Sequence, residues 1–430
     1  MRTLSQWLDW QSSLNPAEID LGLQRVRQVW ERLTPPDLQS VVITVAGTNG
    51  KGSSVALLEA ILKAAGYTTG SYTSPHLLNY NERIRLGGIP VRDQMICDAF
   101  QRIEQARQGL PLTYFEFGTL AALLICVDAA VDVCILEVGL GGRLDAVNII
   151  DADAALVTSI ALDHQNWLGD DRESIGREMA GIFRSGKPAV FSSDDPPLSM
   201  LDYAGQTGTP MYLLGRDFQL QVEDEHGWSW QGPAASWNNL PVPALPGAHQ
   251  LRNAAGVLMV LDRLAGRLPL DQAAIEQGLA EVRINGRSQF IPGSVSWLLD
   301  VAHNPHAVNM LADNLRAIKP SGRVVALLGM LNDKDAGSVF QIMQPLVDEW
   351  HLTALDEPRA YTAAELEQQL ELRLPKARGI KHSDIGNALT SASRSCREGD
   401  LVLVFGSFHT VAGALKWRED NGLSSRGRYG

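Results

Sequence analysis

The sequence is poor in cysteine and contains no thiol motif. It has only four cysteines in 430 residues, Cys97, Cys126, Cys134 and Cys396, and none pairs with another in a Cys-x-x-Cys unit. Cys126 and Cys134 lie in apolar runs, where the simplest interpretation is that they are small buried hydrophobic residues. The cysteine usage therefore fits a reducing compartment.

Long apolar runs and positive charge are also missing. The longest apolar stretch, residues 120–127, is far too short to span a bilayer, and Met1 to Trp10 has no apolar core of signal-peptide length. The net charge of −12 argues against a general nucleic-acid binder, although a local site on an acidic protein can still bind anions. We expect a cytoplasmic protein that binds neither membrane nor nucleic acid.

What remains is an ordinary globular composition, with 45% hydrophobic and 20% charged residues. Three apolar runs suit strands that are covered on both faces, at 41–46, 131–137 and 154–158. A helix is expected at 53–65, ending at Gly66. Strands that alternate with helices indicate a parallel sheet with helices on both faces, so the predicted fold class is α/β.

The amino-acid composition and the predicted secondary structure change at two places along the chain. Residues 216–245 contain three tryptophans among prolines and glycines, which is typical of a β-rich insert, and helices are expected again at 250–266 and 270–279. Residues 284–287, followed by Pro292-Gly293, are typical of a linker. Beyond it, strands are expected at 295–301, 324–328 and 401–405, and helices at 305–318 and 363–370. We therefore predict an N-terminal domain over 1–285 and a smaller α/β domain over 286–430.

The strongest local signal is the segment AGTNGKGS at 46–53, which follows the first strand and opens a helix. Its glycines let several backbone N–H groups point at one centre, while the helix N-terminus and Lys51 add positive charge. Ser53 can offer a hydroxyl to a metal or a phosphate. An ordinary glycine turn is the alternative, but this pattern after a buried strand favours nucleotide-phosphate binding.

Oxygen and nitrogen ligands follow other strands. Glu137 ends the strand at 131–137, where an acid can hold Mg²⁺ at the ligand-binding edge of a parallel sheet. His164 is either a metal ligand or a satisfied loop histidine, and Ser74 is either one more oxygen ligand or a turn serine. A strand-end surface acid is the alternative for Glu137.

A second polar group closes the strand at 295–301. Asp300 can hydrogen-bond a ribose or orient a neighbour, and His303 can reach a phosphate, although a polar helix entry is the alternative. Arg287 could clamp a nucleotide, and Asn253 could contact a nucleobase edge. Pattern alone does not decide the roles of these last two residues.

Eight segments occur in one order over almost the whole chain, and together they identify a family. They are 44–53 (TVAGTNGKGS), 73–77, 81–84, 112–116, 137–145 (EVGLGGRLD), 163–164, 300–306 (DVAHNPH) and 329–335 (GMLNDKD). On these segments the chain resembles the Mur-ligase superfamily and, within it, the family of bacterial bifunctional dihydrofolate synthase/folylpolyglutamate synthases.

The resemblance implies a P-loop ATPase-type domain followed by a Rossmann-like domain, with ATP bound between them. Lys51 and His303 are the residues expected to act in catalysis, His303 as a phosphate contact. The implied ATP contacts are Gly47, Thr48, Asn49, Gly50, Lys51, Gly52, Ser53, Asn253, Arg287, Asp300 and His303. The implied Mg²⁺ ligands are Ser74, Glu137 and His164. The implied acceptor contacts are Arg83, Phe115, Asp145 and Ala146.

One position departs from the family. Met179 stands where the family has a lysine that CO₂ converts to a carbamate, which helps to bind Mg²⁺. A thioether forms no carbamate and is a poor Mg²⁺ ligand. Glu178 is no simple substitute, because neighbouring helix residues point about 100° apart. We therefore expect metal binding to be weakened or altered.

The resemblance implies an ATP-dependent ligase that adds L-glutamate to dihydropteroate and to reduced folates through an acyl-phosphate, acting as a monomer. Three alternatives remain at this point. A kinase or nucleotide switch would turn over ATP without glutamate, and a cell-wall Mur ligase would require a uridine-nucleotide substrate. A folate- and ATP-binding homologue with weakened catalysis is supported by Met179 alone.

Overall fold

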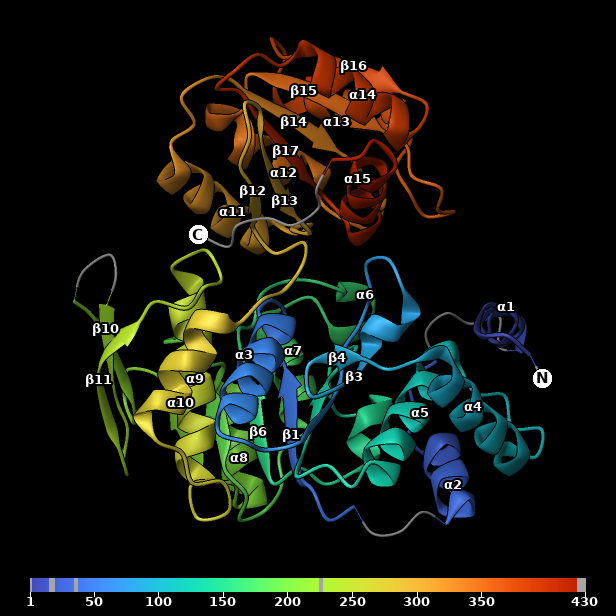
Figure 1. Ribbon diagram of the computed structural model, residues 1–430, viewed down its shortest axis with the longest axis vertical. Coiled ribbons are helices and arrows are strands. Elements are labelled where there is room, and N and C mark those ends of the chain that lie inside the picture. Colours follow the sequence, from blue (N-terminus) through green and yellow to red (C-terminus); the bar gives the residue numbers. More distant parts are fainter. Residues whose placement is uncertain (1, 15–19, 35–37, 224–226, 424–430) are drawn as a thin grey trace. The chain divides into compact units, whose positions relative to one another are not determined.

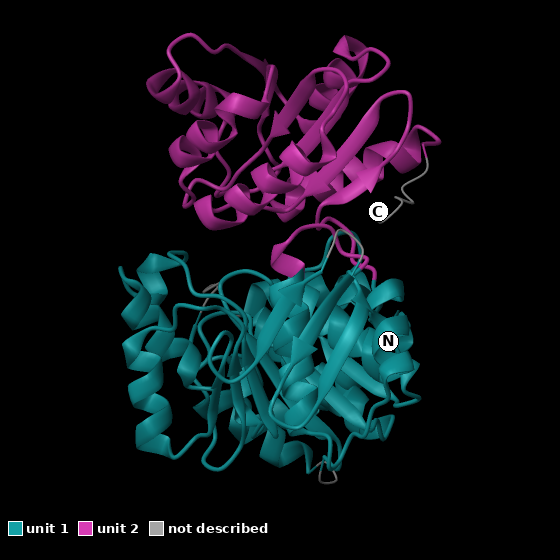
Figure 2. Cartoon of the chain, turned by 90° about the vertical axis from the view of Figure 1, so that its left-hand side faces the viewer, with its two compact units in different colours: residues 1–243, 251–282 teal, residues 244–250, 283–430 magenta. Residues whose placement is uncertain are grey.

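The structure is a computed structural model that describes residues 2–14, 20–34, 38–223 and 227–423. It divides into two compact units, which Figure 2 colours separately. Unit 1 comprises Met1–Pro243 and Leu251–Val282, and unit 2 comprises Ala244–Gln250 and Arg283–Gly430. The predicted division into an ATP-binding domain over 1–285 and a ligase domain over 286–430 stays a prediction. In the described part of the chain, no helix is long and apolar enough to cross a membrane.

Unit 1 is built on an eight-stranded sheet in the order β4-β3-β2-β5-β1-β6-β7-β8. Its strands are β1 (Val41–Ala46), β2 (Thr69–Tyr72), β3 (Ile84–Leu86), β4 (Ile89–Pro90), β5 (Val133–Glu137), β6 (Ala154–Val157), β7 (Ala189–Phe191) and β8 (Met211–Leu213). The strands from β2 to β8 in this order are parallel, and the short β3 and β4 add an antiparallel edge. The α/β class and three of its strands are therefore confirmed.

The centre of this sheet is buried throughout and largely apolar. All six residues of β1 are buried, and so are all five of β5. A strand covered by helices on both faces has no solvent side, so it needs a continuous apolar run instead of alternation. The side chains of β1 thus fix it at the middle of the sheet, with β5 and β6 as its neighbours.

The helices of unit 1 follow the strands. They are α1 (Leu4–Leu14), α2 (Gln24–Leu33), α3 (Lys51–Ala64), η1 (Tyr80–Arg83), α4 (Asp93–Arg107), α5 (Tyr114–Asp128), η2 (Ala146–Ile149), α6 (Gln165–Leu168), α7 (Arg172–Ala180), α8 (Leu198–Thr207), α9 (His249–Arg263), whose first two residues belong to unit 2, and α10 (Gln272–Glu281). Figure 1 shows α10 beside α3, and α4 beside both α2 and α5. The predicted helix at 53–65 begins two residues earlier, because the phosphate loop closes directly on its first turn.

The segment predicted as a β-rich insert contains a small antiparallel sheet. Its strands are β9 (Gln219–Val222), β10 (Gly227–Gln231) and β11 (Ser236–Pro241). Trp228 and Trp230 are fully buried, and the Trp230 indole N–H donates to the Ala255 carbonyl at 3.1 Å, which joins this sheet to α9. Residues 224–226 of the segment lie outside the described residues.

Unit 2 has its own six-stranded sheet in the order β12-β13-β17-β14-β15-β16. Its strands are β12 (Gln289–Ile291), β13 (Ser296–Asp300), β14 (Val324–Leu328), β15 (Glu349–Thr353), β16 (Gly379–His382) and β17 (Leu401–Phe405). Its helices are α11 (Pro305–Ile318), α12 (Ala336–Met343), η3 (Gln344–Leu346), α13 (Ala363–Arg373), α14 (Ile385–Ser395) and α15 (Phe408–Asp420). Five strands are parallel, as predicted for an α/β unit.

The exception corrects the sequence analysis. The stretch taken for a linker contains β12, which pairs antiparallel with β13 through Phe290 opposite Leu298. Three residues are too few to show the alternation that identifies a strand. Pro292-Gly293 marks the turn between the two strands and not the end of a linker.

Candidate functional site

The phosphate loop lies between β1 and α3, as its position in the sequence predicted. Gly47 and Gly50 have φ values of 137° and 92°, a region that favours glycine. A Cβ on Gly47 would lie 2.0 Å from the Thr158 hydroxyl oxygen, so a side chain there cannot fit. The Lys51 ammonium donates to the carbonyls of Gly47 at 2.7 Å and Thr48 at 3.3 Å. Lys51 is thereby held over its own loop.

Residues at the carboxyl end of β6 brace this loop, and the sequence analysis missed them. The Thr48 N–H donates to the Ser159 carbonyl at 2.7 Å, and the hydroxyls of Thr158 and Ser159 donate to the Asn49 carbonyl at 2.6 and 3.1 Å. The Ala161 N–H donates to the Thr48 hydroxyl at 3.0 Å. Hydroxyl residues directly after a neighbouring parallel strand were the available signal.

Asn253 of α9 also adjoins the loop. A Cβ on Gly50 would lie 2.7 Å from the Asn253 amide oxygen, and Asn253 is buried. Sequence pattern gave no role to this residue, and the structure brings it to the start of α3. Ser53 lies in the first turn of α3, directly after the phosphate loop, and is also buried. The predicted ATP contacts of unit 1 therefore form one group.

Two of the predicted metal ligands also lie together. Glu137, the last residue of β5, is buried, and its carboxylate accepts the Ser74 N–H at 3.2 Å. Strand register explains this proximity, since β2 and β1 both pair with β5, with Tyr72 opposite Leu136 and Val45 opposite Glu137. Ser74 follows the end of β2 by two residues. The buried carboxylate thus faces the loop that carries Ser74.

His164 lies in the loop after β6, the strand that braces the phosphate loop. Its φ of 51° is left-handed, and its imidazole Nε2 is 4.0 Å from an Asp163 carboxylate oxygen. Among the described residues, no group of three or more His, Cys, Asp and Glu side chains is close enough to hold a metal ion. A metal bound here would need hydroxyl, water or phosphate oxygens beside Glu137, which is the coordination that Mg²⁺ accepts readily.

Two of the predicted acceptor contacts, Phe115 and Asp145, lie beside Gly139, two residues after Glu137. A Cβ on Gly139 would lie 2.7 Å from the Phe115 ring and 3.2 Å from an Asp145 carboxylate oxygen. Asp145 caps η2 and accepts the N–H groups of Leu140 and Val147 at 2.9 and 3.0 Å. Burial raises the pKa of Asp145 to about 6, although these hydrogen bonds and the Lys51 charge oppose the rise. Ala146, the first residue of η2, is buried.

Arg83 lies among aromatic side chains near the same group. Its guanidinium is 5.4 Å from the ring centre of Tyr80 and 5.3 Å from that of Tyr114, and its Nε donates to His76 Nδ1 at 2.8 Å. Tyr72 packs on Phe115 with ring centres 5.6 Å apart. Burial raises the pKa of Tyr72 to about 12, and the Arg83 charge lowers it. Arg83 is thus linked through Tyr72 to Phe115.

Unit 2 carries the second predicted group at the end of β13. The Asp300 carboxylate accepts the Ser288 N–H and hydroxyl at 2.7 and 2.9 Å and the Ala302 N–H at 2.7 Å, so it orients its neighbours. Arg287 lies over the Phe408 ring at 5.2 Å, and His303 Nδ1 is 2.8 Å from the Val301 carbonyl oxygen.

His249 is a residue of this group that the sequence analysis missed. Burial lowers the pKa of its imidazole, Asp300 raises it, and Arg287 and His306 lower it further. These electrostatic interactions place His249 among the predicted nucleotide contacts of unit 2. The sequence signal that could have identified His249 is its spacing from Asn253, because residues four apart in a helix are neighbours on one face.

Met179 is buried in the core of unit 1, with only 3% of its surface exposed. Its backbone carbonyl lies 3.0 Å from where a Cβ on Gly142 would be, so it adjoins the glycine run that follows Glu137. The neighbouring Glu178 carboxylate pairs with Arg143 at 2.9 Å. Glu178 is therefore engaged elsewhere, in agreement with the expectation that it does not replace a ligand at position 179.

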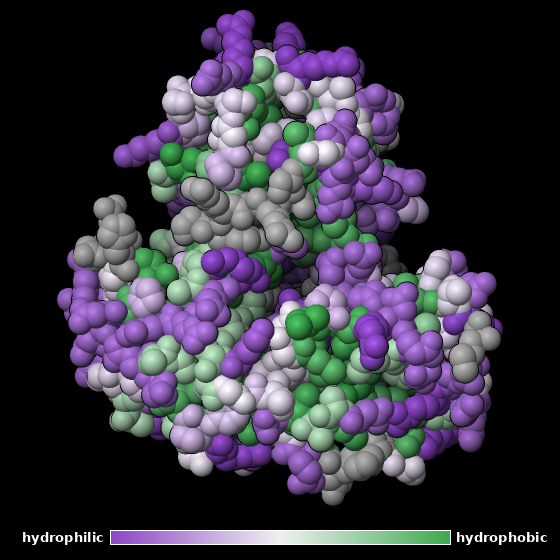
Figure 3. Space-filling view, viewed as in Figure 1, coloured by the Kyte–Doolittle hydropathy of each residue, from purple (hydrophilic) through white to green (hydrophobic). Residues whose placement is uncertain are grey.

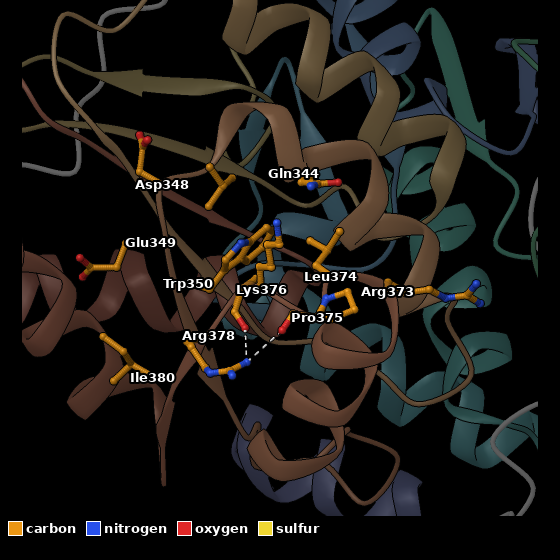
Figure 4. Close-up of a pocket in the computed structure, with 12 residues that line it drawn as sticks. Gln344, Asp348, Glu349, Trp350, Arg373, Leu374, Pro375, Lys376, Arg378 and Ile380 are labelled. Atoms are coloured by element: carbon orange, nitrogen blue, oxygen red, sulfur yellow. Dashed lines mark hydrogen bonds between the residues drawn. The ribbon is translucent and has the colours of Figure 1, made fainter.

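A cavity of about 740 Å³ in unit 2 lies away from these groups (Figure 4). Its lining includes Glu349, Trp350, Arg378 and Ile380, at the amino ends of β15 and β16, and Arg378 donates to two nearby carbonyls. The described residues that line it include no predicted site residue. Ligands of parallel sheets bind at carboxyl ends, so we place the site at the groups above and not at this cavity.

Comparison with known proteins gives one consistent family. Residues 286–408 match the family model described as "Mur ligase, glutamate ligase domain". Dihydrofolate synthase/folylpolyglutamate synthase of Escherichia coli K12 is 44% identical over 413 residues, covering 96% of this chain and 95% of that protein. The protein of the same name from Haemophilus influenzae is 39% identical, covering 95% of this chain and 96% of that protein.

Solved structures agree. E. coli FolC in complex with DHPP and ADP superimposes with a TM-score of 0.93 at 42% identity, covering 98% of this chain and 99% of that chain. The Yersinia pestis bifunctional folylpolyglutamate synthase/dihydrofolate synthase complexed with AMPPNP and Mn ion has a TM-score of 0.89 at 45% identity, covering 97% and 98%. A further structure of an enzyme of this name holds Mn, AMPPNP and L-glutamate, with a TM-score of 0.88 and 45% identity, covering 97% and 98%.

Proposed function

The chain belongs to the dihydrofolate synthase/folylpolyglutamate synthase family, and on that premise we propose that it joins L-glutamate to dihydropteroate and to reduced folates. It is an ATP-dependent acid–amino-acid ligase. The first reaction forms dihydrofolate, and the second extends the glutamate tail of a folate. Both activate a carboxylate as an acyl-phosphate.

One observation carries the proposal: four segments meet at one edge of the unit 1 sheet. β2, β5, β1 and β6 are consecutive and parallel. The loops that bear Ser74, the phosphate loop and His164 begin at their carboxyl ends, and Glu137 is itself the last residue of β5. Ligands of open parallel sheets bind at this edge. The proximity of Glu137 to Ser74 and of the phosphate loop to the β6 end supports a shared site.

We assign the phosphates of ATP to the amides of 47–53 and to Lys51, and Mg²⁺ to Ser74, Glu137 and His164. A carboxylate and a hydroxyl are oxygen ligands that Mg²⁺ prefers, and Mg²⁺ commonly completes its shell with water and phosphate oxygens. The buried Glu137 beside Ser74 fits that chemistry. When bound, the ion neutralises charge on the phosphates.

The acceptor carboxylate must attack the γ-phosphorus of ATP, which breaks the bond to the β-phosphate, releases ADP and forms the acyl-phosphate. Two anions approach each other in this step. The Lys51 ammonium and the loop N–H groups offset this repulsion and hold the terminal phosphate in line. The neutral amine of glutamate then attacks the acyl carbon, the carbon–nitrogen bond forms, and phosphate leaves as the amine loses a proton. Water must be excluded, because it would hydrolyse the mixed anhydride.

Arg83, Phe115, Asp145 and Ala146 are assigned to the acceptor. Phe115 offers a flat ring to an aromatic acceptor, and Asp145 offers a carboxyl group for its polar edge. The proximity of Phe115 and Asp145 to Gly139 supports this assignment. Asn253, Arg287, Asp300 and His303 are assigned to the nucleotide, with His303 as a phosphate contact, so that residues 1–285 and 286–430 act as an ATP-binding and a ligase domain.

We further propose that the protein is a cytoplasmic monomer whose partners are ATP, the folate or pteroate acceptor and L-glutamate. The acidic net charge of −12 offers no support for nucleic-acid binding. Reduced folates, ATP and free glutamate are all compatible with the reducing compartment that the unpaired cysteines indicate.

A coupled assay tests the function. Purified protein with Mg-ATP should release ADP only when dihydropteroate or a reduced folate and L-glutamate are both present, and mass spectrometry should detect one added glutamate per ADP. Omitting glutamate is the control for a kinase or switch, and a uridine-nucleotide acceptor is the control for a cell-wall ligase. ADP release that ignores glutamate would contradict the proposal.

Met179 supports a second candidate, a homologue with weakened metal binding and catalysis. Met179 packs in the hydrophobic core of unit 1, and its thioether cannot form the carbamate that helps to bind Mg²⁺ in the family. In that case the coupled assay would still show ligation, but only at raised Mg²⁺ concentration or at a low rate.

A further inference from the structure

An ion pair joins two helix starts of unit 1 that are far apart in sequence. Arg25 is the second residue of α2, and Glu116 is in the first turn of α5. The Arg25 Nε lies 2.9 and 2.8 Å from the two Glu116 carboxylate oxygens, and the side chains are 20% and 4% exposed. A guanidinium buried to this degree against a carboxylate fixes both backbone segments in place.

The same guanidinium also holds the chain that leads into α2. Arg25 Nη1 pairs with the Asp20 carboxylate at 2.7 Å, and its Nη2 donates to the Asp20 backbone carbonyl. Arg25 therefore joins three groups at once: the Asp20 side chain, the Asp20 backbone and Glu116. A single-point cation such as lysine cannot reproduce this fork.

Glu116 is fixed from its other side by the capping box of α5. Its carboxylate accepts the Thr113 N–H at 2.8 Å, and its own N–H donates to the Thr113 hydroxyl at 3.2 Å. Burial raises the pKa of Glu116, and the hydrogen bonds from Arg25 and Thr113 oppose that rise. Phe115 is the residue directly before Glu116, so the ion pair sets the start of the helix turn that carries Phe115.

The start of η2 completes this junction. α2 packs against both α5 and η2, and η2 begins with Ala146 directly after Asp145. The segments that carry the proposed acceptor contacts Phe115, Asp145 and Ala146 are thus both in contact with α2, the helix that contains Arg25. The proposed mechanism gives Arg25 no role of its own, so its contribution must come through the segments that it holds.

We propose that Arg25 is a positioning residue for the acceptor: through Glu116 it holds Phe115 at the angle at which an aromatic pteridine or aminobenzoyl group binds. The proposal rests on the proposed function, which makes Phe115 an acceptor contact. Small displacements of a binding side chain weaken binding of a rigid ligand strongly.

A merely structural brace is the competing interpretation, and the chain offers a matched control for it. Arg85 of β3 pairs with Glu59 of α3 at 2.9 Å, and these side chains are 18% and 7% exposed. The two pairs are similar in burial and join elements of the same unit. Arg85 has no place in the proposed site.

The test compares Arg25→Met, Arg25→Lys and Glu116→Gln with Arg85→Met in the full-length enzyme. Steady-state kinetics give KM for dihydropteroate, KM for ATP and kcat, and thermal unfolding gives Tm. We expect Arg25→Met and Glu116→Gln to raise the acceptor KM about tenfold with the ATP KM changed less than twofold. Arg25→Lys should recover only part of the loss. Arg85→Met should lower Tm without changing the acceptor KM.

Equal effects of Arg25→Met and Arg85→Met on the acceptor KM would overturn the proposal, as would full recovery with Arg25→Lys. The variant Phe115→Ala distinguishes a failure of the positioning role from a failure of the proposed acceptor site. If Phe115→Ala raises the acceptor KM and Arg25→Met does not, the positioning role is wrong and the proposed site stands. If Phe115→Ala leaves the acceptor KM unchanged, the proposed acceptor site itself is wrong.

Discussion

Among single residues, Lys51 is the one whose charge the proposed chemistry needs most. Replacing it with methionine keeps most of the side-chain volume but removes the cation facing the phosphates. We expect Lys51→Met to lower kcat about 10²- to 10³-fold, the range typical of a lost transition-state charge contact. ADP release in the coupled assay measures this. Lys63→Met, an exposed position in the last turn of the same helix, is the control and should retain activity. A Lys51→Met enzyme within threefold of the wild type would contradict the role.

Asp145 should make stability depend on pH. Its pKa in the folded protein is about 6 because of burial, whereas an unfolded aspartate titrates near 3.9. Between these values the folded state binds more protons, so this residue's contribution is fully present below about pH 3.9 and is lost as pH rises through 6. We expect the wild type to lose roughly 2 kcal/mol relative to Asp145→Asn between pH 4 and pH 7. Urea unfolding of both proteins measures the difference, and parallel pH profiles would contradict it.

Met179 tests how this chain binds its metal. Met179→Lys would place an amine in an apolar core, where it is destabilising unless CO₂ converts it to a carbamate. With bicarbonate present, we expect the half-saturating Mg²⁺ concentration to fall severalfold or kcat to rise. Met179→Leu, which keeps the volume without an amine, should change neither. If lysine brings no gain in rate or Mg²⁺ affinity, altered metal binding at this position is wrong.

At the scale of elements, Gly47 before the start of α3 and Gly66 after its end have left-handed backbones with different surroundings. Gly47 has a positive φ that alanine adopts only with strain, and the added Cβ of Gly47→Ala would lie 2.0 Å from the Thr158 hydroxyl oxygen, which is a steric clash. Gly66 has a φ of 88° with nothing near its Cβ position, so Gly66→Ala has the backbone penalty alone. We expect Gly47→Ala to weaken ATP binding at least tenfold in calorimetry, while Gly66→Ala lowers Tm but binds ATP normally. Normal ATP affinity in Gly47→Ala would show that the loop does not bind phosphate.

Elements with long apolar runs were predictable, and short ones were not. β1, β14 and β17 match the predicted ranges residue for residue, because a parallel strand covered on both faces reads as a nearly continuous apolar run. β3, β4 and β12 have three, two and three residues, and only pairing with a neighbour makes them strands. Runs of two or three residues are too short to show the alternation by which a strand is identified.

The same limit separates the site residues that the sequence revealed from those it did not. Lys51 follows a buried strand and Glu137 ends one, so local pattern alone gave them a role. Arg25 meets Glu116 across 91 positions, and Thr158 meets Asn49 across 109. Strand order in the sheet creates these contacts, and a single sequence does not state that order.

For the whole molecule we propose a monomer, and the distribution of exposed hydrophobic residues supports this proposal. Large exposed hydrophobic residues in the described chain come from many separate elements: Leu78, Ile89, Leu162, Trp167, Leu198, Val222, Val242, Leu372, Ile380 and Leu423. On the face drawn in Figure 3, hydrophilic residues cover much of the surface and hydrophobic residues appear between them. Singly exposed apolar residues are normal on monomers, whereas stable homodimers bury large apolar patches. A net charge of −12 adds mutual repulsion.

We therefore expect one copy per particle across the working concentrations of the enzyme. Sedimentation equilibrium from about 1 to 50 µM should give a single species of 46.8 kDa, with and without Mg-ATP, because the proposed site draws all its residues from one chain. Specific activity should then be independent of protein concentration, which dilution in the coupled assay checks. A mass near twice this value, or activity lost on dilution and regained on concentration, would mean that a second copy contributes to the folded enzyme.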